Sequence, residues 1–191
     1  LNSITDASGL RNTAMGYDAG TAVTTGDDNV LIGYQAGKAT VSGLQNIAVG
    51  SNALVGNTGS ANIGVGYYAL FSNTSGGGNT AVGTEALESV VTTNNSTAVG
   101  YNALILNTAA ANTAIGAYSL DANTSGVRNT ALGYSSLSAI VTANDSTAVG
   151  YNALALGTGG GNTAVGTYAG DELTSSTDNT AVGFAALSAA S

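Results

Sequence analysis

A short phrase, Asn-Thr-Ala-Val-Gly followed closely by Ala-Leu, recurs along the chain and constrains its fold more than any other feature. It reads cleanly at residues 79–83, 162–166 and 179–183. Successive copies are 17, 17, 16, 17, 17, 16, 17, 17, 16 and 17 residues apart, so a 50-residue period of three copies is superimposed on the shorter one. Eleven copies are marked by their glycines: Gly16, Gly33, Gly50, Gly66, Gly83, Gly100, Gly116, Gly133, Gly150, Gly166 and Gly183.

A repeat of 16–17 residues cannot fold alone. Ordering each residue costs about 1–2 kcal/mol of backbone entropy, whereas each buried aliphatic side chain returns only about 1.5–3 kcal/mol. Repeats must therefore stack. Paired helices need about 33 residues or more, and the Val, Thr, Ile and Tyr content favours strands between Gly, Asn and Ser turns. The repeat predicts an all-β parallel β-solenoid or left-handed β-roll, roughly 50 Å long at about 4.8 Å per coil.

The repeats run without a linker or a shift in composition. We expect a lead-in or partial cap coil at residues 1–15, one continuous array at 16–187, and a tail at 188–191. Terminal repeats normally carry a polar cap, and neither end shows one, so the chain is expected to be part of a longer array.

A large aliphatic side chain precedes every marking glycine. Stacked coils need a dry column of such side chains, so we expect these residues to form the core. The column comprises Met15, Ile32, Val49, Val65, Val82, Val99, Ile115, Leu132, Val149, Val165 and Val182.

Asparagine lies four residues before the glycine in nine of the eleven copies. We expect a stacked ladder in which amides at one corner bond to the coils above and below, because Asn also tolerates the left-handed backbone of a corner. A row of amides facing a ligand is the functional alternative. The column comprises Asn12, Asn29, Asn46, Asn62, Asn79, Asn112, Asn129, Asn162 and Asn179.

Tyrosine follows the glycine directly in six copies, and two interpretations remain open. The rings either cover an apolar edge or touch a second chain, or they form a free surface that stacks against sugar rings. This candidate contact surface comprises Tyr17, Tyr34, Tyr67, Tyr101, Tyr134 and Tyr151.

The two columns before the aliphatic one are also regular. Threonine usually begins the segment, but Val30, Ile47 and Ile63 take the same position, which predicts a partly or fully buried site. A regular exposed Thr array would instead suit ice or a polysaccharide. The alanine column that follows marks either a tight interior or a close approach to another chain.

Composition excludes several functions. Three basic residues against eleven acidic ones give a net charge of −8, which argues against nucleic acid and an anionic membrane surface. Without His or Cys, Ser–His or Cys–His catalysis and the usual zinc sites are excluded. The acidic residues do not recur at the coil period, so solvated charge is favoured over calcium. We expect no enzyme activity, no cofactor, no metal and no membrane insertion.

The phrase Asn-Ser/Thr-x-Ala-Val/Ile-Gly-x-x-Ala resembles the head repeat of trimeric autotransporter adhesins, the YadA-type left-handed β-roll. Arrays of Asn-Thr-Ala-Val-Gly-Tyr-Asn-Ala-Leu are similar to the repetitive shafts of phage tail fibres and related bacterial surface fibres. The resemblance covers residues 12–187. It implies a homotrimer, an extracellular setting and an attachment role, and it carries over no receptor-binding residue.

We therefore expect a structural or adhesive segment of an extracellular fibre, at a cell surface or on a virion. The expected partners are copies of the chain, as a trimer or an end-to-end filament, and a surface receptor or glycan. The alternative is an ice- or carbohydrate-binding β-solenoid that acts through one flat repetitive face.

Overall fold

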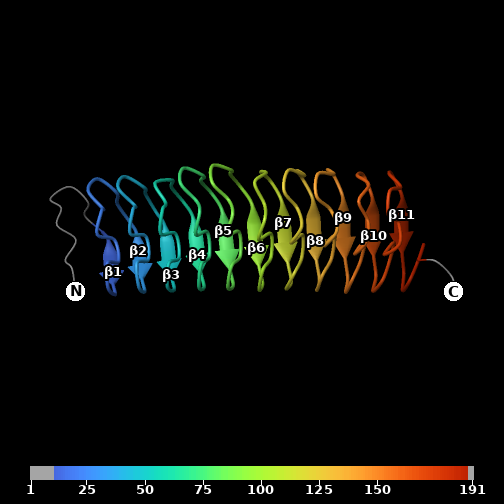
Figure 1. Ribbon diagram of the computed structural model, residues 1–191, viewed down its shortest axis with the longest axis horizontal. Helices are drawn as coiled ribbons and strands as arrows, with labels where there is room; N and C mark the ends of the chain where they lie inside the picture. Colours follow the sequence, from blue (N-terminus) through green and yellow to red (C-terminus); the bar gives the residue numbers. More distant parts are fainter. Residues whose placement is uncertain (1–10, 189–191) are drawn as a thin grey trace.

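The computed structural model describes residues 11–188, which form one rod of stacked coils (Figure 1). Each coil contributes one three-residue strand, and the eleven strands form a single parallel sheet in chain order. The prediction of an all-β parallel solenoid with a coil of about 17 residues is confirmed. The strands are β1 (Thr13–Met15), β2 (Val30–Ile32), β3 (Ile47–Val49), β4 (Ile63–Val65), β5 (Thr80–Val82), β6 (Thr97–Val99), β7 (Thr113–Ile115), β8 (Thr130–Leu132), β9 (Thr147–Val149), β10 (Thr163–Val165) and β11 (Thr180–Val182).

Equivalent residues of neighbouring coils face each other directly. In β5 and β6, for example, Thr80, Ala81 and Val82 pair with Thr97, Ala98 and Val99. Strand β1 lies within the expected lead-in segment, whose residues 1–10 lie outside the described residues, as do residues 189–191 of the expected tail.

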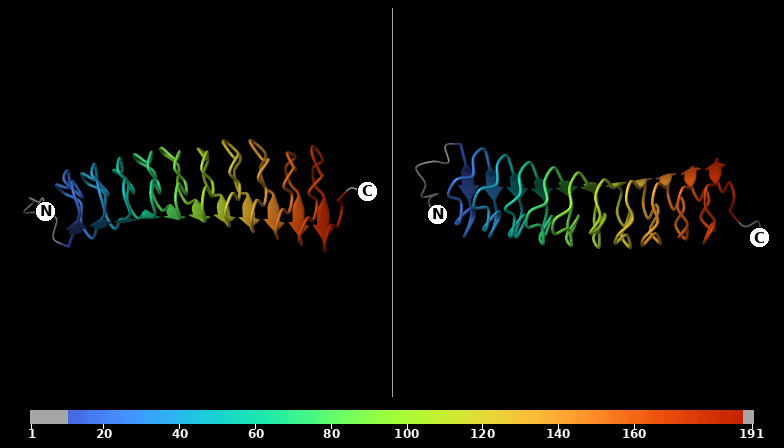
Figure 2. Two further views of the ribbon diagram at one scale, coloured as in Figure 1. Left: turned by 60° about the horizontal axis from the view of Figure 1, so that its bottom comes forward. Right: turned by 90° about the horizontal axis from the view of Figure 1, so that it is seen from above.

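Backbone hydrogen bonds join the coils well beyond the strands. On the turn that follows each strand, the Leu87 N–H donates to the Ala103 carbonyl of the next coil at 3.1 Å. On the far loop, the Thr74 N–H donates to the Val91 carbonyl at 2.8 Å. Figure 2 shows the strands along one side of the rod and a gradual twist between its two ends, as parallel strands require.

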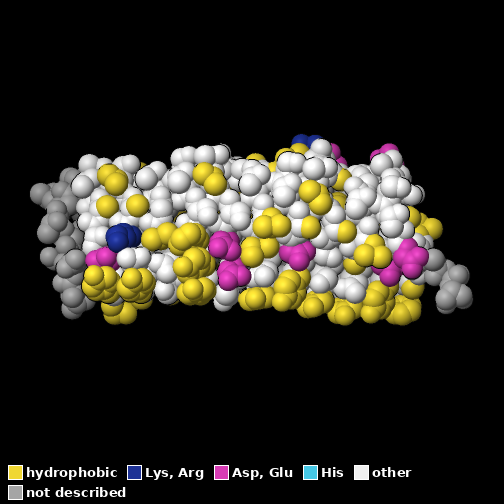
Figure 3. All heavy atoms as spheres, viewed as in Figure 1, with side chains coloured by type: hydrophobic (Ala, Val, Ile, Leu, Met, Phe, Trp, Pro, Cys, Tyr) yellow, Lys and Arg dark blue, Asp and Glu magenta, His cyan; other side chains and the backbone are white. Residues whose placement is uncertain are grey.

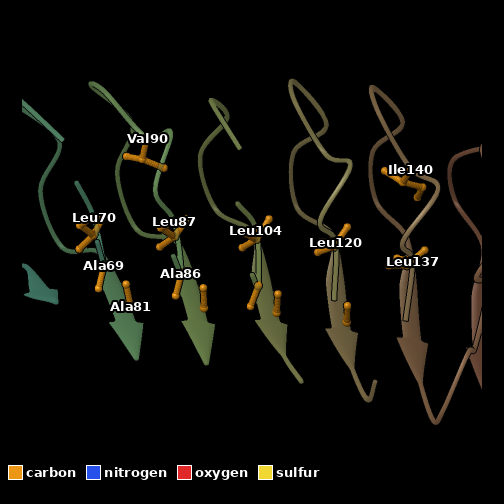
Figure 4. Close-up of a cluster of buried hydrophobic side chains, with 14 of the residues drawn as sticks. Ala69, Leu70, Ala81, Ala86, Leu87, Val90, Leu104, Leu120, Leu137 and Ile140 are labelled. Carbon is orange, nitrogen blue, oxygen red and sulfur yellow. The ribbon is translucent and has the colours of Figure 1, made fainter. Parts of the chain in front are cut away.

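Stacked columns of apolar side chains fill the interior, and two of them lie opposite each other (Figure 4). The central residue of each strand, which is alanine in nine of the eleven, points inward and is fully buried in most coils. A leucine four residues after the marking glycine packs opposite it, and seven such leucines are buried one above another: Leu54, Leu70, Leu87, Leu104, Leu120, Leu137 and Leu154. The core is therefore narrow, with small side chains on the strand and large ones on the turn.

The prediction that the aliphatic column before each glycine forms the core is wrong. Its members stack in register, but on the outer face of the sheet, where six are exposed and the other five are half-buried. Successive residues of a strand point to opposite faces, so an inward alanine places both of its neighbours outside. The misassigned residues are Met15, Ile32, Val49, Val65, Val82, Val99, Ile115, Leu132, Val149, Val165 and Val182.

The buried leucines adopt an unusual backbone conformation. Leu87, for example, has φ 51°, in the left-handed region, and the other six are similar. That conformation costs a non-glycine residue roughly 1–2 kcal/mol, whereas burying a leucine completely returns about 1.5–3 kcal/mol. Burial therefore outweighs the backbone cost by a small margin, and the turn holds a large core side chain where glycine would be easier.

Candidate interaction surfaces

The outer face of the sheet presents two parallel columns of uncharged side chains. Each strand directs its first and third residues outward, and the first is Thr, Val or Ile while the third is always aliphatic. Six members of the first column are half-buried and five are exposed, so the partial or full burial predicted from the exchange of Thr with Val and Ile is found in only six coils. The result is a continuous face without a charged side chain over all eleven strands. We call it the sheet face.

The asparagine column lies inside the corner that directly precedes each strand, and it joins coil to coil by hydrogen bonds. The Asn62 side-chain oxygen accepts from the Asn79 backbone N–H at 3.0 Å, and the Asn62 side-chain nitrogen donates to the Gly76 carbonyl at 2.7 Å. The Asn79 oxygen in turn accepts from the Ser96 N–H at 3.0 Å. Seven of the nine asparagines are buried, so this column is unavailable to an external ligand: Asn29, Asn46, Asn62, Asn79, Asn112, Asn129 and Asn162.

A second set of buried asparagines accompanies the 50-residue period. Asn73 donates to the Asn57 side-chain oxygen at 2.7 Å, and Asn123 donates to that of Asn107 at 2.8 Å. Two coils that lie 50 residues apart hold a buried aliphatic residue at this position instead, Val90 and Ile140. The sequence interpretation missed this set, although the spacing of exactly one super-period between Asn57 and Asn107 is visible in the sequence.

Removing the side chain of one buried asparagine is expected to destabilise the rod measurably. Asn79→Ala leaves the buried Ser96 N–H and the Thr93 carbonyl without their partners, which are bonded at 3.0 and 2.8 Å. Each unsatisfied group costs about 1–3 kcal/mol, so we expect a total loss of about 2–4 kcal/mol in urea unfolding. The matched control is Asn94→Ala, because Asn94 also bridges coils, to Gly77 N–H at 2.7 Å, but lies in water. Equal losses in the two variants would contradict a buried ladder.

The tyrosines at the ends of the strands lie on the surface and contact one another. Six rings in six consecutive coils form a continuous series with centroid separations of 5.3–6.3 Å. Two coils carry Ala117 or Thr167 directly after the glycine, and there a tyrosine one residue later fills the gap. We call this series the aromatic ladder: Tyr101, Tyr118, Tyr134, Tyr151, Tyr168 and Phe184.

The remaining predicted contact residues form smaller groups. Tyr17 and Tyr34 stack at 5.6 Å, and Tyr67 packs against Tyr68 at 4.3 Å. All six predicted tyrosines are at least 46% exposed, even where they stack. The predicted contact surface left out Tyr118 and Tyr168, which lie one residue later in the repeat, because the left-handed turn that brings them into line is not visible in the sequence.

Two Asn–Asp pairs lie beside the ladder and repeat after 50 residues. Asn102 is second after its glycine and Asp121 is fifth after the glycine of the next coil; Asn152 and Asp171 hold the same positions. Coil geometry brings these positions together, because the equivalent Asp18 and Lys38 form an ion pair at 3.1 Å. In both Asn–Asp pairs, one side-chain oxygen of each residue is buried and has no hydrogen-bond partner in the described chain.

Burial also raises the pKa of the Asp121 carboxyl above its ordinary value. Tyr118 has a raised pKa as well, first because of burial and then because of Tyr101, Tyr134 and the Asp121 charge. The unpartnered oxygens of the pairs are buried beneath the surface, next to the row of rings.

All three cations of the chain, Arg11, Lys38 and Arg128, form ion pairs, and none of them contacts the two Asn–Asp pairs. Arg128 binds Asp145 through two hydrogen bonds of 2.6 and 2.8 Å, which raise the pKa of Arg128 and lower that of Asp145. Arg11 pairs with Asp27 and Asp28. These pairs are exposed to solvent and contribute little to stability.

Among the described residues, no group of three or more His, Cys, Asp and Glu side chains is arranged to hold a metal ion. Within 11–188, no helix is long and apolar enough to span a bilayer. Comparisons with models of known protein families, with curated proteins and with solved structures found no match.

Proposed function

We propose that the chain is a structural and adhesive segment of an extended extracellular fibre, at a cell surface or on a virion, in which three copies associate along their sheet faces. The observation that carries the proposal is the unbroken outer face of the eleven-stranded sheet, which is uncharged from β1 to β11 and carries an aliphatic column along its whole length. A stiff rod with one such face is suited to bundling, and the resemblance of its repeat to fibre proteins points the same way.

The size of the sheet face supports association. Eleven strands at about 4.8 Å extend roughly 50 Å, and two side-chain columns give a width of roughly 10 Å, so each chain offers roughly 500 Å². That area matches the largest apolar patches on monomers, and two such faces together approach the roughly 1,000 Å² of a specific interface.

The charge distribution supports copies of the same chain as the occupant. Each chain carries a net charge of −8, which would oppose contact between copies if the acidic residues lay at the interface. No charged side chain occupies the outward columns of the sheet, so association buries no carboxylate. The ion pairs and free carboxylates remain in the turns and loops.

In this role the rod acts mechanically and involves no catalytic step. Stacked coils space equivalent side chains regularly along the fibre, and three chains repeat that arrangement around it. Individually weak contacts with a target then add through effective concentration, which raises avidity without any new contact.

A charge on the sheet face is expected to separate the copies. Val82→Asp places a carboxylate at a position that is 36% exposed in the single chain, so the fold is retained, while a trimer would have to bury that charge. Sedimentation equilibrium should give three times the chain mass for the parent protein and one chain mass for the variant.

The matched control is Val91→Asp, which introduces the same charge at an exposed valine in the far loop of the same coil. It should retain the trimer mass. A parent protein with the mass of a single chain would refute the trimer, and masses that grow without limit with concentration would indicate an end-to-end filament instead.

A second candidate is binding to ice or a carbohydrate through the sheet face itself. Eight of the eleven strands begin with an outward threonine, and the strand spacing is regular. The outward partner column is aliphatic, however, and the sheet twists along the rod (Figure 2). Facetted ice crystals at micromolar protein, together with a monomer mass, would favour this candidate over the fibre.

A further inference from the structure

We propose that two stacked tyrosine pairs, Tyr134–Tyr151 and Tyr17–Tyr34, are sites at which one-electron oxidation forms dityrosine and so joins neighbouring coils covalently. The inference goes beyond the proposed fibre role and does not depend on the association of copies. The co-reactant is a one-electron oxidant, such as a haem peroxidase with hydrogen peroxide.

The two pairs differ from the other tyrosine contacts in the orientation of their rings. The ring centroids of Tyr134 and Tyr151 lie 5.4 Å apart with 11° between the ring planes, and those of Tyr17 and Tyr34 lie 5.6 Å apart at 10°. The sequence explains this orientation, because only at these two places do consecutive coils both carry tyrosine directly after the marking glycine. Strand β8 pairs with β9 in register, and β1 with β2, so side chains at equivalent positions lie side by side and their rings stack.

Tyr101 and Tyr118 provide a matched contrast within the aromatic ladder. Their ring centroids are 5.3 Å apart, as close as in the stacked pairs, but their planes meet at 79°. Coupling of two phenoxyl radicals needs overlap of the orbitals that stand perpendicular to each ring plane. Parallel rings direct those orbitals at one another, whereas perpendicular rings do not. Holding two reacting groups in the productive orientation replaces a chance encounter by an intramolecular step.

The composition of the chain directs oxidation to tyrosine. The chain has nine tyrosines, one methionine, no tryptophan and no cysteine, so few other side chains compete for the oxidant. The four rings of the two pairs are at least 46% exposed. Figure 3 shows a row of apolar side chains, a class that includes tyrosine, along the lower edge of the rod, where the strands of Figure 1 end. An oxidant in solution therefore reaches the rings directly.

The coupling step balances with the oxidant alone. Each phenol gives one electron to the oxidant and its hydroxyl proton to water. The two phenoxyl radicals then form one carbon–carbon bond between ring positions ortho to the oxygens, and the two ortho hydrogens shift to oxygen as the rings regain aromaticity. One molecule of hydrogen peroxide accepts the two electrons with two protons and leaves as two molecules of water.

A bond of this kind clips one coil to the next in a chain that cannot form a disulfide. Without cysteine, the coils adhere through hydrogen bonds and a narrow apolar core. In both pairs the joined residues are 17 positions apart. A cross-link over such a loop restricts the unfolded chain, as a disulfide does, and this restriction stabilises the folded rod.

The test is oxidation of the full chain by a haem peroxidase and hydrogen peroxide at low protein concentration, followed by an endoprotease that cleaves before aspartate. Asp145 separates the two tyrosines of the ladder pair, so residues 121–144 and 145–170 should appear as one joined peptide that is lighter than their sum by two hydrogens. Dityrosine fluorescence measures the total yield.

Two variants separate the stacked pair from the rest of the ladder. Tyr134→Phe keeps the ring but lacks the phenol, so the joined peptide should be lost. Tyr118→Phe is the matched control, because it removes a phenol from edge-on contacts with Tyr101 and Tyr134 and should leave the yield of that peptide unchanged. The oxidised parent protein should unfold at a higher urea concentration than oxidised Tyr134→Phe. Circular dichroism accompanies every variant.

Absence of the joined peptide, an equal yield in Tyr134→Phe, or equally abundant coupling of Tyr101 to Tyr118 would overturn the proposal. Joined peptides found only in covalent dimers of the chain would also overturn it, because the bond would then lie between copies. Equal urea midpoints for the oxidised parent and oxidised Tyr134→Phe would refute the stabilising clip. The sedimentation mass enters none of these outcomes, so the fibre proposal stands or fails separately.

Discussion

Replacing Gly83 with alanine is expected to lower the free energy of unfolding by more than about 4 kcal/mol, an exceptional loss for the addition of one methyl group. Gly83 has φ 138°, a conformation that L residues rarely adopt. A Cβ there would lie 2.4 Å from the carbonyl oxygen of Gly100 in the next coil. Because the obstructing oxygen belongs to the backbone of the next coil, whose position is fixed by the coil spacing, the clash cannot be relieved by a rotamer change. The variant should interrupt the array at this coil.

Two control variants separate the steric clash with the next coil from the backbone strain at the glycine. Gly56→Ala should be neutral or slightly stabilising, because its Cβ would meet nothing closer than 3.6 Å and four other coils carry alanine at the same place. Gly183→Ala retains the unfavourable φ of 124° but has no atom nearer than 4.0 Å, so it should cost only the backbone strain of about 1–3 kcal/mol. Urea unfolding followed by circular dichroism and by tyrosine fluorescence measures all three. A Gly83→Ala loss no larger than that of Gly183→Ala would show that coil contact is not the cause.

The repeat alone predicted the stacked all-β coil, because a 16–17-residue unit leaves few ways to bury side chains. The register followed as well, since a fixed period places Val82 beside Val99. What the repeat did not reveal is which side of each strand faces inward. Two large apolar columns compete for one interior, and only the turn leucines, such as Leu87, fit there.

The alanine column contained the missing signal. Nine of eleven copies keep alanine at the centre of the strand. That alanine points to the same side as the buried asparagine two positions earlier, so both face a tight interior. The residue after the alanine, such as Val82 or Ile115, must then point outward. The aromatic ladder needed coordinates for a different reason. Tyr118 and Tyr168 join it only because a left-handed residue redirects the side chain after the marking glycine.

The exceptional second coil offers the sharpest test of this interior. Leu31 replaces the strand alanine there, and glycine replaces the turn leucine at Gly20 and Gly37. A Cβ at Gly37 would lie 2.4 Å from a methyl carbon of Leu31, and one at Gly20 would lie 2.8 Å from the other. The large and small residues have thus exchanged sides, and the single Leu31 side chain lies against both glycines.

Gly37→Leu is therefore expected to cost about 3 kcal/mol by overpacking, although leucine tolerates this backbone in seven other coils, as at Leu54 with φ 51° against 55° for Gly37. Leu31→Ala should cost about 2–5 kcal/mol by leaving a cavity. Combining the two recreates the arrangement of the regular coils, so the losses should not add. We expect a coupling free energy of at least about 2 kcal/mol in a double-mutant cycle. Residual instability should come from the space beside Gly20, and Gly20→Leu in the combined background should remove part of it. Additive losses in the cycle would mean that the two positions do not share one cavity.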